Sequence, residues 1–332
     1  MKKSKVLLSY AALICFLILL PLLVKDPRWM HLMIMTGIYI MLAGGLRLIM
    51  STGQVSFAHA GFWAIGAYTS TLLVMKLGLS FWLALPLSGL MGAVAAALVG
   101  YPCLRLQGPY FFLVTIAFGE VLRLVIVNWN FLGGDAGISN IPYPNPITIG
   151  GLALQFSYRS VHYYYLMLVG LLCSLFIFYR LERSRFGLTC SGVRGDADLS
   201  ASLGVEVMRY KMTAFVVASL IASMAGSFFA HYVTYISPGF FTFNESLILL
   251  IMVVVGGSES ITGVIIGVIL INALTEATRE FASYEIVIYG AALVLIFRFS
   301  PGGILYLWTG FVGGRRSMKA RPGVGSGGRD AA

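Results

Sequence analysis

The stretch RLERSRFGLTCSGVRGDADLSASLGVEVMRYK, residues 180–211, is flanked by two long apolar runs at 161–179 and 210–234. The chain is 58% hydrophobic and only 11% charged, and this stretch holds its largest internal cluster of charge. Apolar runs of about 20 residues cross a hydrocarbon core of about 30 Å as helices. Because lipid cannot satisfy backbone hydrogen bonds, the two runs predict membrane helices. The charged stretch between them predicts a surface loop that another protein can hold.

Similar apolar runs recur along the chain and predict an all-α, polytopic membrane protein with about ten transmembrane helices. Barrel strands would alternate polar and apolar residues, and the sequence has no such alternation. The expected spans are 7–24, 30–50, 56–75, 81–104, 110–128, 161–179, 210–234, 243–257, 261–277 and 284–299. The spans 243–257 and 284–299 are short, so eight or nine crossings and a re-entrant segment are open alternatives.

Basic residues predict the orientation, because cytoplasmic loops collect Lys and Arg. With the N-terminus inside, the residues on or beside the cytoplasmic face are Lys2, Lys3, Lys5, Arg105, Arg180, Arg183, Arg185, Arg194, Arg209, Lys211, Arg298, Arg315, Arg316, Lys319, Arg321 and Arg329. The outer side has only Lys25, Arg28, Lys76, Arg159 and Arg279, while Arg47 and Arg123 lie within or near the ends of spans. Both termini are therefore predicted to be cytoplasmic. The net charge of +10 indicates this topology and an attraction to anionic lipid, with no need for nucleic acid.

The spans predict one transmembrane domain, residues 1–312, followed by a flexible cytoplasmic tail, residues 313–332, that ends in GVGSGGRDAA. The longest segment on the outer side, residues 129–160, contains GGDAGISNIPYPNP. A loop rich in Gly and Pro is often a tether, whereas one of this length is also typical of a lid or a docking surface. The sequence leaves both alternatives open.

Polar residues within the expected spans are few. Glu120 and Arg123 are three residues apart on one helical face, which predicts a structural ion pair, with a place on a translocation path as the alternative. His59, close to Gln54, is typical of a hydrogen-bonded packing residue rather than a ligand or a proton carrier.

Small residues recur at every fourth position and predict close helix packing. They form the rows Ala214, Ala218, Ala222, Gly226 and Ala230; Ser88, Gly92, Ala96 and Gly100; and Gly263 with Gly267. The sequence leaves open whether these rows pack within one bundle or against a second subunit.

Sequence signatures of catalysis are missing. The chain has no GxxxxGK[ST] phosphate loop, no HExxH and no GxSxG, and the spacing of its cysteines does not indicate a metal site. We therefore expect a protein that is not an enzyme and that binds no metal or cofactor of its own. A transporter of this kind either equilibrates its solute passively, as a secondary transporter or channel, or takes free energy from a partner. The charged stretch at 180–211 favours the partner.

Four segments, in order and covering most of the chain, resemble a known family. They are GLRLIMSTGQVSFAHAGFWAIGAY (45–68), GPYFFLVTIAFGEVLRLVIVNW with GGDAGISNIP (108–142), RFGLTCSGVRGDADLSASLGVEVMRYKMTAFVVASLIASMAGSFFA (185–230) and SPGFFTFNESLILLIMVVVGGSESITGVIIG (237–267). Together they are similar to the permease subunits of bacterial branched-chain amino-acid ABC importers, of the LivM type. The closing RFSPGGIL (298–305) is similar to that family's ending.

The resemblance implies the partners and the location. It implies a multi-pass permease in the bacterial inner membrane, paired with a second permease subunit of the LivH type. It further implies two separate ATPase subunits that hold ATP and Mg, and a periplasmic binding protein that delivers a branched-chain or related amino acid. Translocation in such importers is by alternating access.

The resemblance also implies functional sites. A coupling helix at 196–205, seated in a groove of the ATPase, involves Arg194, Asp196, Asp198, Leu203, Gly204 and Val205. Gly204 stands at the family's characteristic glycine, but Ala197 replaces an expected acid and Asp198 an expected apolar residue, which leaves the register of the contact open. The candidate path or gate residues are Gln54, Ser56, His59 and Gly61 on the cytoplasmic side, and Gly133, Gly134 and Asp135 of a GGDAG loop on the outer side.

Overall fold

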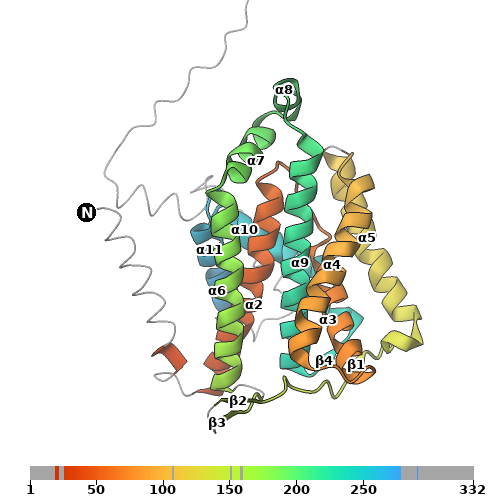
Figure 1. The fold of residues 1–332 in the computed structure, drawn as a ribbon, viewed down its shortest axis with the longest axis vertical. Coiled ribbons are helices and arrows are strands. Elements are labelled where there is room, and N and C mark those ends of the chain that lie inside the picture. Colours follow the sequence, from red (N-terminus) through yellow and green to blue (C-terminus); the bar gives the residue numbers. More distant parts are fainter. Residues whose placement is uncertain are drawn as a thin grey trace, which may run out of the picture.

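The structure, a computed structural model, describes residues 19–21, 26–106, 108–149, 152–157, 160–277 and 290. Its main helices run roughly side by side in a bundle (Figure 1): α2 Pro27–Met50, α3 His59–Met75, α4 Phe81–Cys103, α5 Pro109–Asn128, α6 Val161–Glu182, α9 Val207–Val233, α10 Phe243–Gly256 and α11 Ile261–Ala277. Six described segments are long and apolar enough to cross a membrane. The expected spans 7–24 and 284–299 lie almost entirely outside the described residues, so the total of about ten stays a prediction.

Short elements occupy the two ends of the bundle. Helices α7 Arg185–Gly195 and α8 Ala197–Ser202 project from one end, here named the α8 end (Figure 1). The opposite, strand end has the short helix η1 Asn130–Leu132 and the strands β1 Ile138–Ser139, β2 Ile147–Ile149, β3 Leu152–Leu154 and β4 Tyr235–Ile236. Strand β1 pairs antiparallel with β4, and β2 with β3. The predicted outer loop 129–160 therefore contains ordered backbone.

Helix α9 lies at the centre and packs against α2, α3 and α4. Its small residues allow this: a Cβ on Gly226 would overlap the backbone of Trp63 in α3, and a Cβ on Gly92 of α4 would overlap Ser223 of α9. Gly263 and Gly267 approach the backbone of α10 in the same way. All three rows of small residues thus serve packing inside this one chain.

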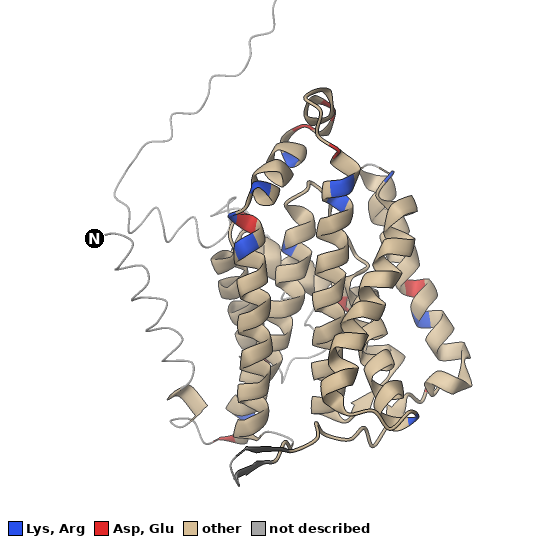
Figure 2. Ribbon diagram, in the orientation of Figure 1, with Lys and Arg blue, Asp and Glu red and all other residues tan. Residues whose placement is uncertain are grey.

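Basic residues gather at the α8 end of the described part of the chain (Figure 2). They are Arg47, Arg105, Arg180, Arg183, Arg185, Arg194, Arg209 and Lys211, whereas the strand end has Arg28 and Lys76. The asymmetry agrees with the loop charges from which the orientation was predicted.

Three helix ends differ from the expected spans by three residues each, within the few residues allowed for them. Helix α6 extends through Glu182 and α9 begins at Val207, so the connecting segment 180–211 is mostly helical. Arg, Lys and Glu are good helix formers, so a helix can continue beyond its apolar run. The next helix, α7, begins where the Ser184 side chain caps it by accepting from the Phe186 N–H. The span expected at 56–75 begins as a helix only at His59.

Candidate functional site

Two helices of the bundle begin in its interior. Helix α3 has 17 residues and α10 has 14, which corresponds to about 26 and 21 Å, less than a hydrocarbon core of about 30 Å. The start of α3 lies beside α2, where a Cβ on Gly45 would be 2.9 Å from Nε2 of His59. The start of α10 lies beside the middle of α2, where the Tyr39 hydroxyl donates to Glu245 at 3.1 Å. Residues 51–58 therefore turn back into the bundle.

The two helix starts meet, and neighbouring side chains satisfy their backbone. Ser246 of α10 donates to the carbonyl of Phe57 at 2.7 Å and accepts from the N–H of Ala60 at 3.2 Å. The Phe57 N–H donates to Thr115 Oγ1 of α5 at 3.2 Å. Irregular backbone at membrane depth is stable only where it is buried in protein or lines a cavity, and these bonds meet that requirement.

A small cleft of about 10 Å³ opens at this meeting point. Its lining comes from the start of α3, from α5 and from the start of α10: Phe57, Ala60, Ile116, Gly119, Glu120, Phe241, Thr242, Phe243 and Ser246. Arg123 Nε donates to Glu120 Oε2 at 2.8 Å, which is the ion pair that the spacing predicts. A Cβ on Gly61 would lie 3.5 Å from the Cα of Gly119. The structure thus brings the candidate gate residue Gly61 against α5 at Gly119, the residue before Glu120.

The other candidate gate residues of this region are buried. Gln54, Ser56 and His59 are 5%, 1% and 0% exposed. Ser56 Oγ accepts from the Ala58 N–H at 3.2 Å. Gln54 Oε1 and both ring nitrogens of His59 have no hydrogen-bond partner within the residues described. His59 is thus fully buried, and the hydrogen bond expected for it is absent from the described part of the chain, so its role as a packing residue stays a prediction.

The outer GGDAG loop lies at the strand end, apart from this cleft. Gly133, Gly134 and Gly137 have positive φ angles, and a Cβ on Gly137 would overlap the carbonyl of Ile236 in β4. The Tyr235 hydroxyl donates to the Ala136 carbonyl at 3.0 Å. Asp135 is exposed, and Gly134 is buried. The loop is thus clamped to β4, which leads through η2 Pro238–Phe240 into the start of α10.

The predicted coupling residues other than Arg194, which belongs to α7, form the projecting tip of the α8 end. Asp196 caps α8 by accepting from the N–H groups of Asp198 and Leu199 at 3.0 and 2.9 Å. Leu203 is 77% exposed. Gly204, with φ of +85°, ends the turn, and the Val205 N–H donates to the Ser200 carbonyl at 3.1 Å. The helix expected at 196–205 is therefore shorter, at Ala197–Ser202, because its cap and its terminating glycine both lie within that range.

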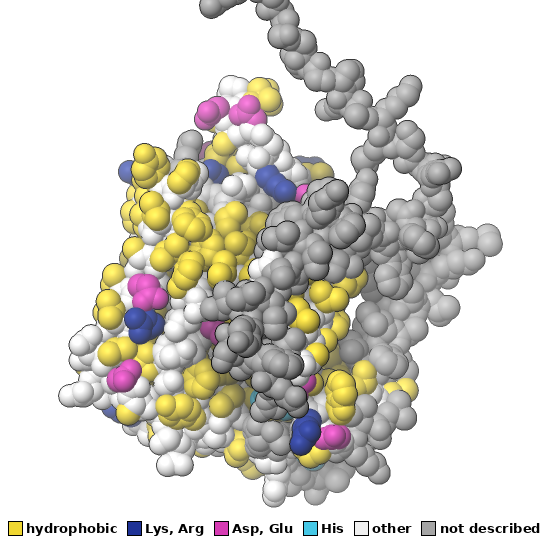
Figure 3. Space-filling model, turned by 180° about the vertical axis from the view of Figure 1, so that it is seen from behind, with side chains coloured by type: hydrophobic (Ala, Val, Ile, Leu, Met, Phe, Trp, Pro, Cys, Tyr) yellow, Lys and Arg dark blue, Asp and Glu magenta, His cyan; other side chains and the backbone are white. Residues whose placement is uncertain are grey.

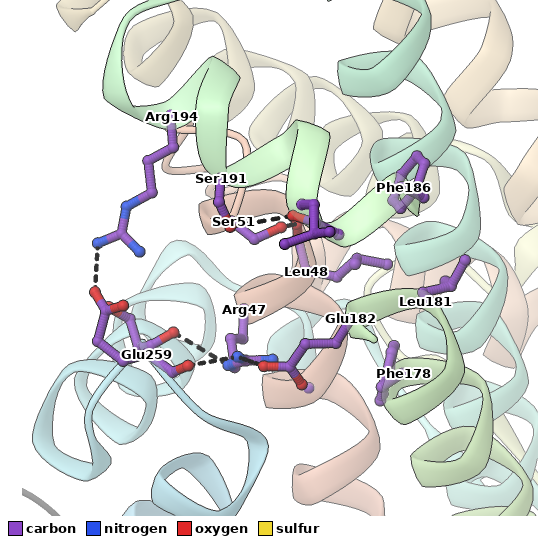
Figure 4. A pocket seen from close by; sticks show the side chains of 14 residues that line it. Arg47, Leu48, Ser51, Phe178, Leu181, Glu182, Phe186, Ser191, Arg194 and Glu259 are labelled. Atoms are coloured by element: carbon purple, nitrogen blue, oxygen red, sulfur yellow. Dashed lines mark hydrogen bonds and ion pairs between the residues drawn. The ribbon is translucent and has the colours of Figure 1, made fainter. Parts of the chain in front are cut away.

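A second cavity, of about 110 Å³, lies at the α8 end between α2, α6, α7 and the turn after α10 (Figure 4). Arg47, only 6% exposed, donates to the carbonyls of Ser258 and Glu259 at 3.1 and 2.9 Å and pairs with Glu182. Arg194 pairs with the Glu259 carboxylate at 2.9 Å. The network joins α7, which leads to the tip, to the α10–α11 turn.

This network was missed in the sequence. Arg47 was recognised only as a charge within or near the end of a span, and its partner Glu182 is 135 residues away. A basic residue inside an apolar run is the one signal of such a network, and it does not identify the partner.

Apolar spans, interior helix starts and a projecting tip define a multi-pass membrane protein with a small cleft where two of its helices begin. In the ranges that the structure describes, no three His, Cys, Asp or Glu residues gather where they could hold a metal ion. Residues 29–297 match the family described as the permease component of branched-chain amino acid transport systems, and the chain belongs to this family. The resemblance seen in the sequence is thereby confirmed.

Named relatives agree with this assignment. The high-affinity branched-chain amino acid permease protein LivM of Escherichia coli K12 is 37% identical over 290 residues, 82% of this chain and 68% of the relative. LivM of Salmonella typhimurium is 38% identical over 293 residues, with the same coverage. The permease protein LivH of Salmonella typhimurium is 25% identical over 289 residues, 80% of this chain and 91% of the relative. No solved structure matches this chain.

Proposed function

We propose that this chain is a transmembrane permease subunit of an ATP-driven importer in the bacterial inner membrane, with both termini in the cytoplasm. Its solutes are leucine, isoleucine and valine or related amino acids. It works with a second permease subunit of the LivH type, two ATPase subunits that bind ATP and Mg, and a periplasmic binding protein. The observation that carries the proposal is the similarity to LivM relatives over most of the chain.

The projecting tip supports coupling to an ATPase. Leu199 and Leu203 are 58% and 77% exposed and contribute little to the bundle, so they are available to a partner. The α8 end also has most of the described basic residues, as expected for a cytoplasmic face. We therefore assign the tip to the ATPase and the strand end to the binding protein.

The contacts within the chain offer a route from the tip to the cleft. Movement of the tip displaces α7, and the Arg194–Glu259 ion pair passes this movement to the α10–α11 turn. The other end of α10 borders the cleft through Ser246. In alternating access, ATP-driven closure of the ATPases would bias this element between two positions, and the solute shifts the equilibrium through its different affinity for each state.

The test is ATP-dependent uptake of labelled leucine, isoleucine and valine by proteoliposomes that contain both permeases, both ATPases and the binding protein. We expect uptake to require ATP and to be lost in a Leu203→Asp variant that still assembles with the second permease. Leu77→Asp is the matched control for assembly with the ATPases, since Leu77 is 68% exposed at the strand end, away from the tip. Uptake by the two permeases without any ATPase would contradict the proposal and favour a secondary transporter.

A further inference from the structure

Helix α5 is the least enclosed of the six candidate spans, with 17% of its most apolar window buried. It lies at the edge of the bundle (Figure 1), and only Phe111, Thr115 and Ile126 of its described residues are buried. Leu113 and Val121, each 58% exposed, belong to an apolar sector that suits contact with lipid. A second membrane subunit or a lipid layer must cover this edge.

One flank of that apolar sector is charged. Helical periodicity places Ile116, Gly119, Glu120 and Arg123 on this side, which we name the Glu120 flank. The two charged side chains are 35% and 31% exposed, and an acidic and a basic group are visible side by side on the mostly hydrophobic α5 edge (Figure 3). By helical rise, Glu120 is about 12 Å from the end of α5 at Asn128. Charges at such depth normally face protein or water rather than hydrocarbon, so lipid alone is a poor cover for this flank.

The cleft beside the Glu120 flank adds two helix N-termini to the charged side chains of the flank. Helices α3 and α10 both begin at this cleft without a side-chain N-cap. Helix N-termini bear partial positive charge, and interior helix starts in transporters point at anionic groups of the solute. The cleft of about 10 Å³ has room for about one water molecule, so a larger solute would lie against the open flank itself.

We propose that the Glu120 flank lines the solute path, with Glu120 binding the ammonium group of a zwitterionic amino acid and Arg123 and the two helix starts favouring its carboxylate. A second permease subunit closes the path over the flank. The inference rests on the proposed function and deepens it, because it names the surface and the groups that recognise the solute.

The first test measures water access to the flank in the assembled importer, with the native cysteines replaced by serine. A hydrophilic, membrane-impermeant thiosulfonate is added to each face of the membrane in turn. We expect the Ile116→Cys variant to react from at least one face and to be protected by leucine. The matched control is Val121→Cys, about 7.5 Å further along α5 and in the apolar sector, which should not react. Failure of Ile116→Cys to react from either face would overturn the proposal.

The second test separates solute binding from a purely structural ion pair. Glu120→Gln and Arg123→Gln should each raise the KM for leucine about tenfold, the usual effect of losing one charge-assisted bond. The exchange of both residues, Glu120→Arg with Arg123→Glu, restores the ion pair but reverses it relative to the helix starts, so KM should stay raised. A wild-type KM in the exchange variant would overturn the proposal, and if the variants do not assemble, the reactivity of Ile116→Cys decides. Loss of uptake by the wild-type importer would instead count against the proposed function.

Discussion

The α3–α4–α9 core and the α8 tip are built in opposite ways. In the core, Gly66 and Gly226 bring helix backbones so close that a Cβ on either would overlap a neighbouring main chain. At the tip, Gly204 has no atom within 4 Å of such a Cβ, and Leu203 is 77% exposed. Each helix of the core is packed on several sides by other helices, whereas α8 at the tip packs mainly against its neighbours α7 and α9 among the described helices.

Because of this difference, substitutions in the core should mainly change the stability of the fold, and substitutions at the tip should mainly change its contact with a partner. Close packing in the core contributes to the favourable free energy of folding, and a small change in side-chain volume there affects several helices. The tip contributes few contacts to the fold, so its exposed leucines remain available to a partner. Arg47 and Arg194 lie between the two regions, around the cavity of Figure 4, where their contacts join α2, α6 and α7 to the turn between α10 and α11.

The largest effect is expected in the core. Gly66→Leu places a side chain where the backbone of Ser223 already lies, and backbone cannot rotate away. Overpacking usually costs about 1–3 kcal/mol, and this substitution should exceed that range and abolish recovery of folded protein. The measurement is size-exclusion chromatography and thermal unfolding in detergent. Gly195→Ala is the control, because nothing lies within 4 Å of its Cβ; equal behaviour of the two variants would remove the contrast between core and tip.

A smaller effect is expected at the Arg47 network. Arg47→Met leaves the Ser258 and Glu259 carbonyls and the Glu182 carboxylate without their donor. Breaking a buried ion pair costs about 3–5 kcal/mol, and because Glu182 is 35% exposed we expect about 2–3 kcal/mol of lost unfolding free energy. Thermal or denaturant unfolding of the purified chain measures it.

The control for Arg47 is an exposed pair. Arg209 and Glu206 are 3.7 Å apart with side chains 79% and 73% exposed, so Arg209→Met should change the unfolding free energy by less than about 1 kcal/mol. If both substitutions had the same small effect, Arg47 would not be the structural link between core and tip.

At the tip, Gly204→Ala tests a purely conformational effect. With φ of +85° and no neighbour, the added methyl group strains the backbone by about 1–2 kcal/mol without a clash. We expect the loss to be local, detected as faster hydrogen exchange in α8 with little change in global unfolding. Gly204→Asn should lose less, since Asn adopts positive φ more readily. A global destabilisation like that of Gly66→Leu would show that the tip is packed after all.

The smallest effect concerns reactivity rather than stability. Cys190 in α7 is fully buried, and burial disfavours the thiolate and raises the pKa of its thiol to about 11. At pH 8 about one thiol in a thousand is therefore ionised. With Cys190 as the sole cysteine, labelling by iodoacetamide should be slow at pH 8 and should accelerate as the pH is raised toward the thiol pKa. Leu199→Cys at the tip, without native cysteines, should label rapidly at pH 8; equal rates would show that α7 is as open as α8.

Much of the bundle could be predicted from the sequence. The runs at 81–104 and 110–128 agree with α4 and α5 to within a residue at each end, because a long apolar run in lipid has no alternative to a helix. The start of α3 was expected three residues too early because the preceding residues 56–58, SFA, look in sequence like a continuation of the apolar run HAGFWAIGAY, residues 59–68. The return of 51–58 into the bundle depends on side chains of α5 and α10, which composition does not reveal.

The candidate site also has features that the sequence predicted and features that it did not. The spacing of Glu120 and Arg123 predicted their ion pair, since residues three apart share a helical face. Their exposure, and the cleft where α3 and α10 begin beside them, depend on which helices surround α5. Gly204 was placed at the family's characteristic glycine inside an expected helix 196–205, whereas the turn at Gly204 and the capping bond made by Asp196 limit α8 to Ala197–Ser202.

The sequence by itself therefore determined the class of the protein and most of its described spans, since these follow from local runs of apolar and charged residues, while its motifs indicated the family and the position of the tip. Only the tertiary structure decided which polar groups from distant parts of the chain meet. Arg47 with Glu182, Phe57 with Ser246 and the GGDAG loop with β4 are far apart in the chain. Contacts of that kind depend on how whole helices pack, and no local pattern of residues encodes them.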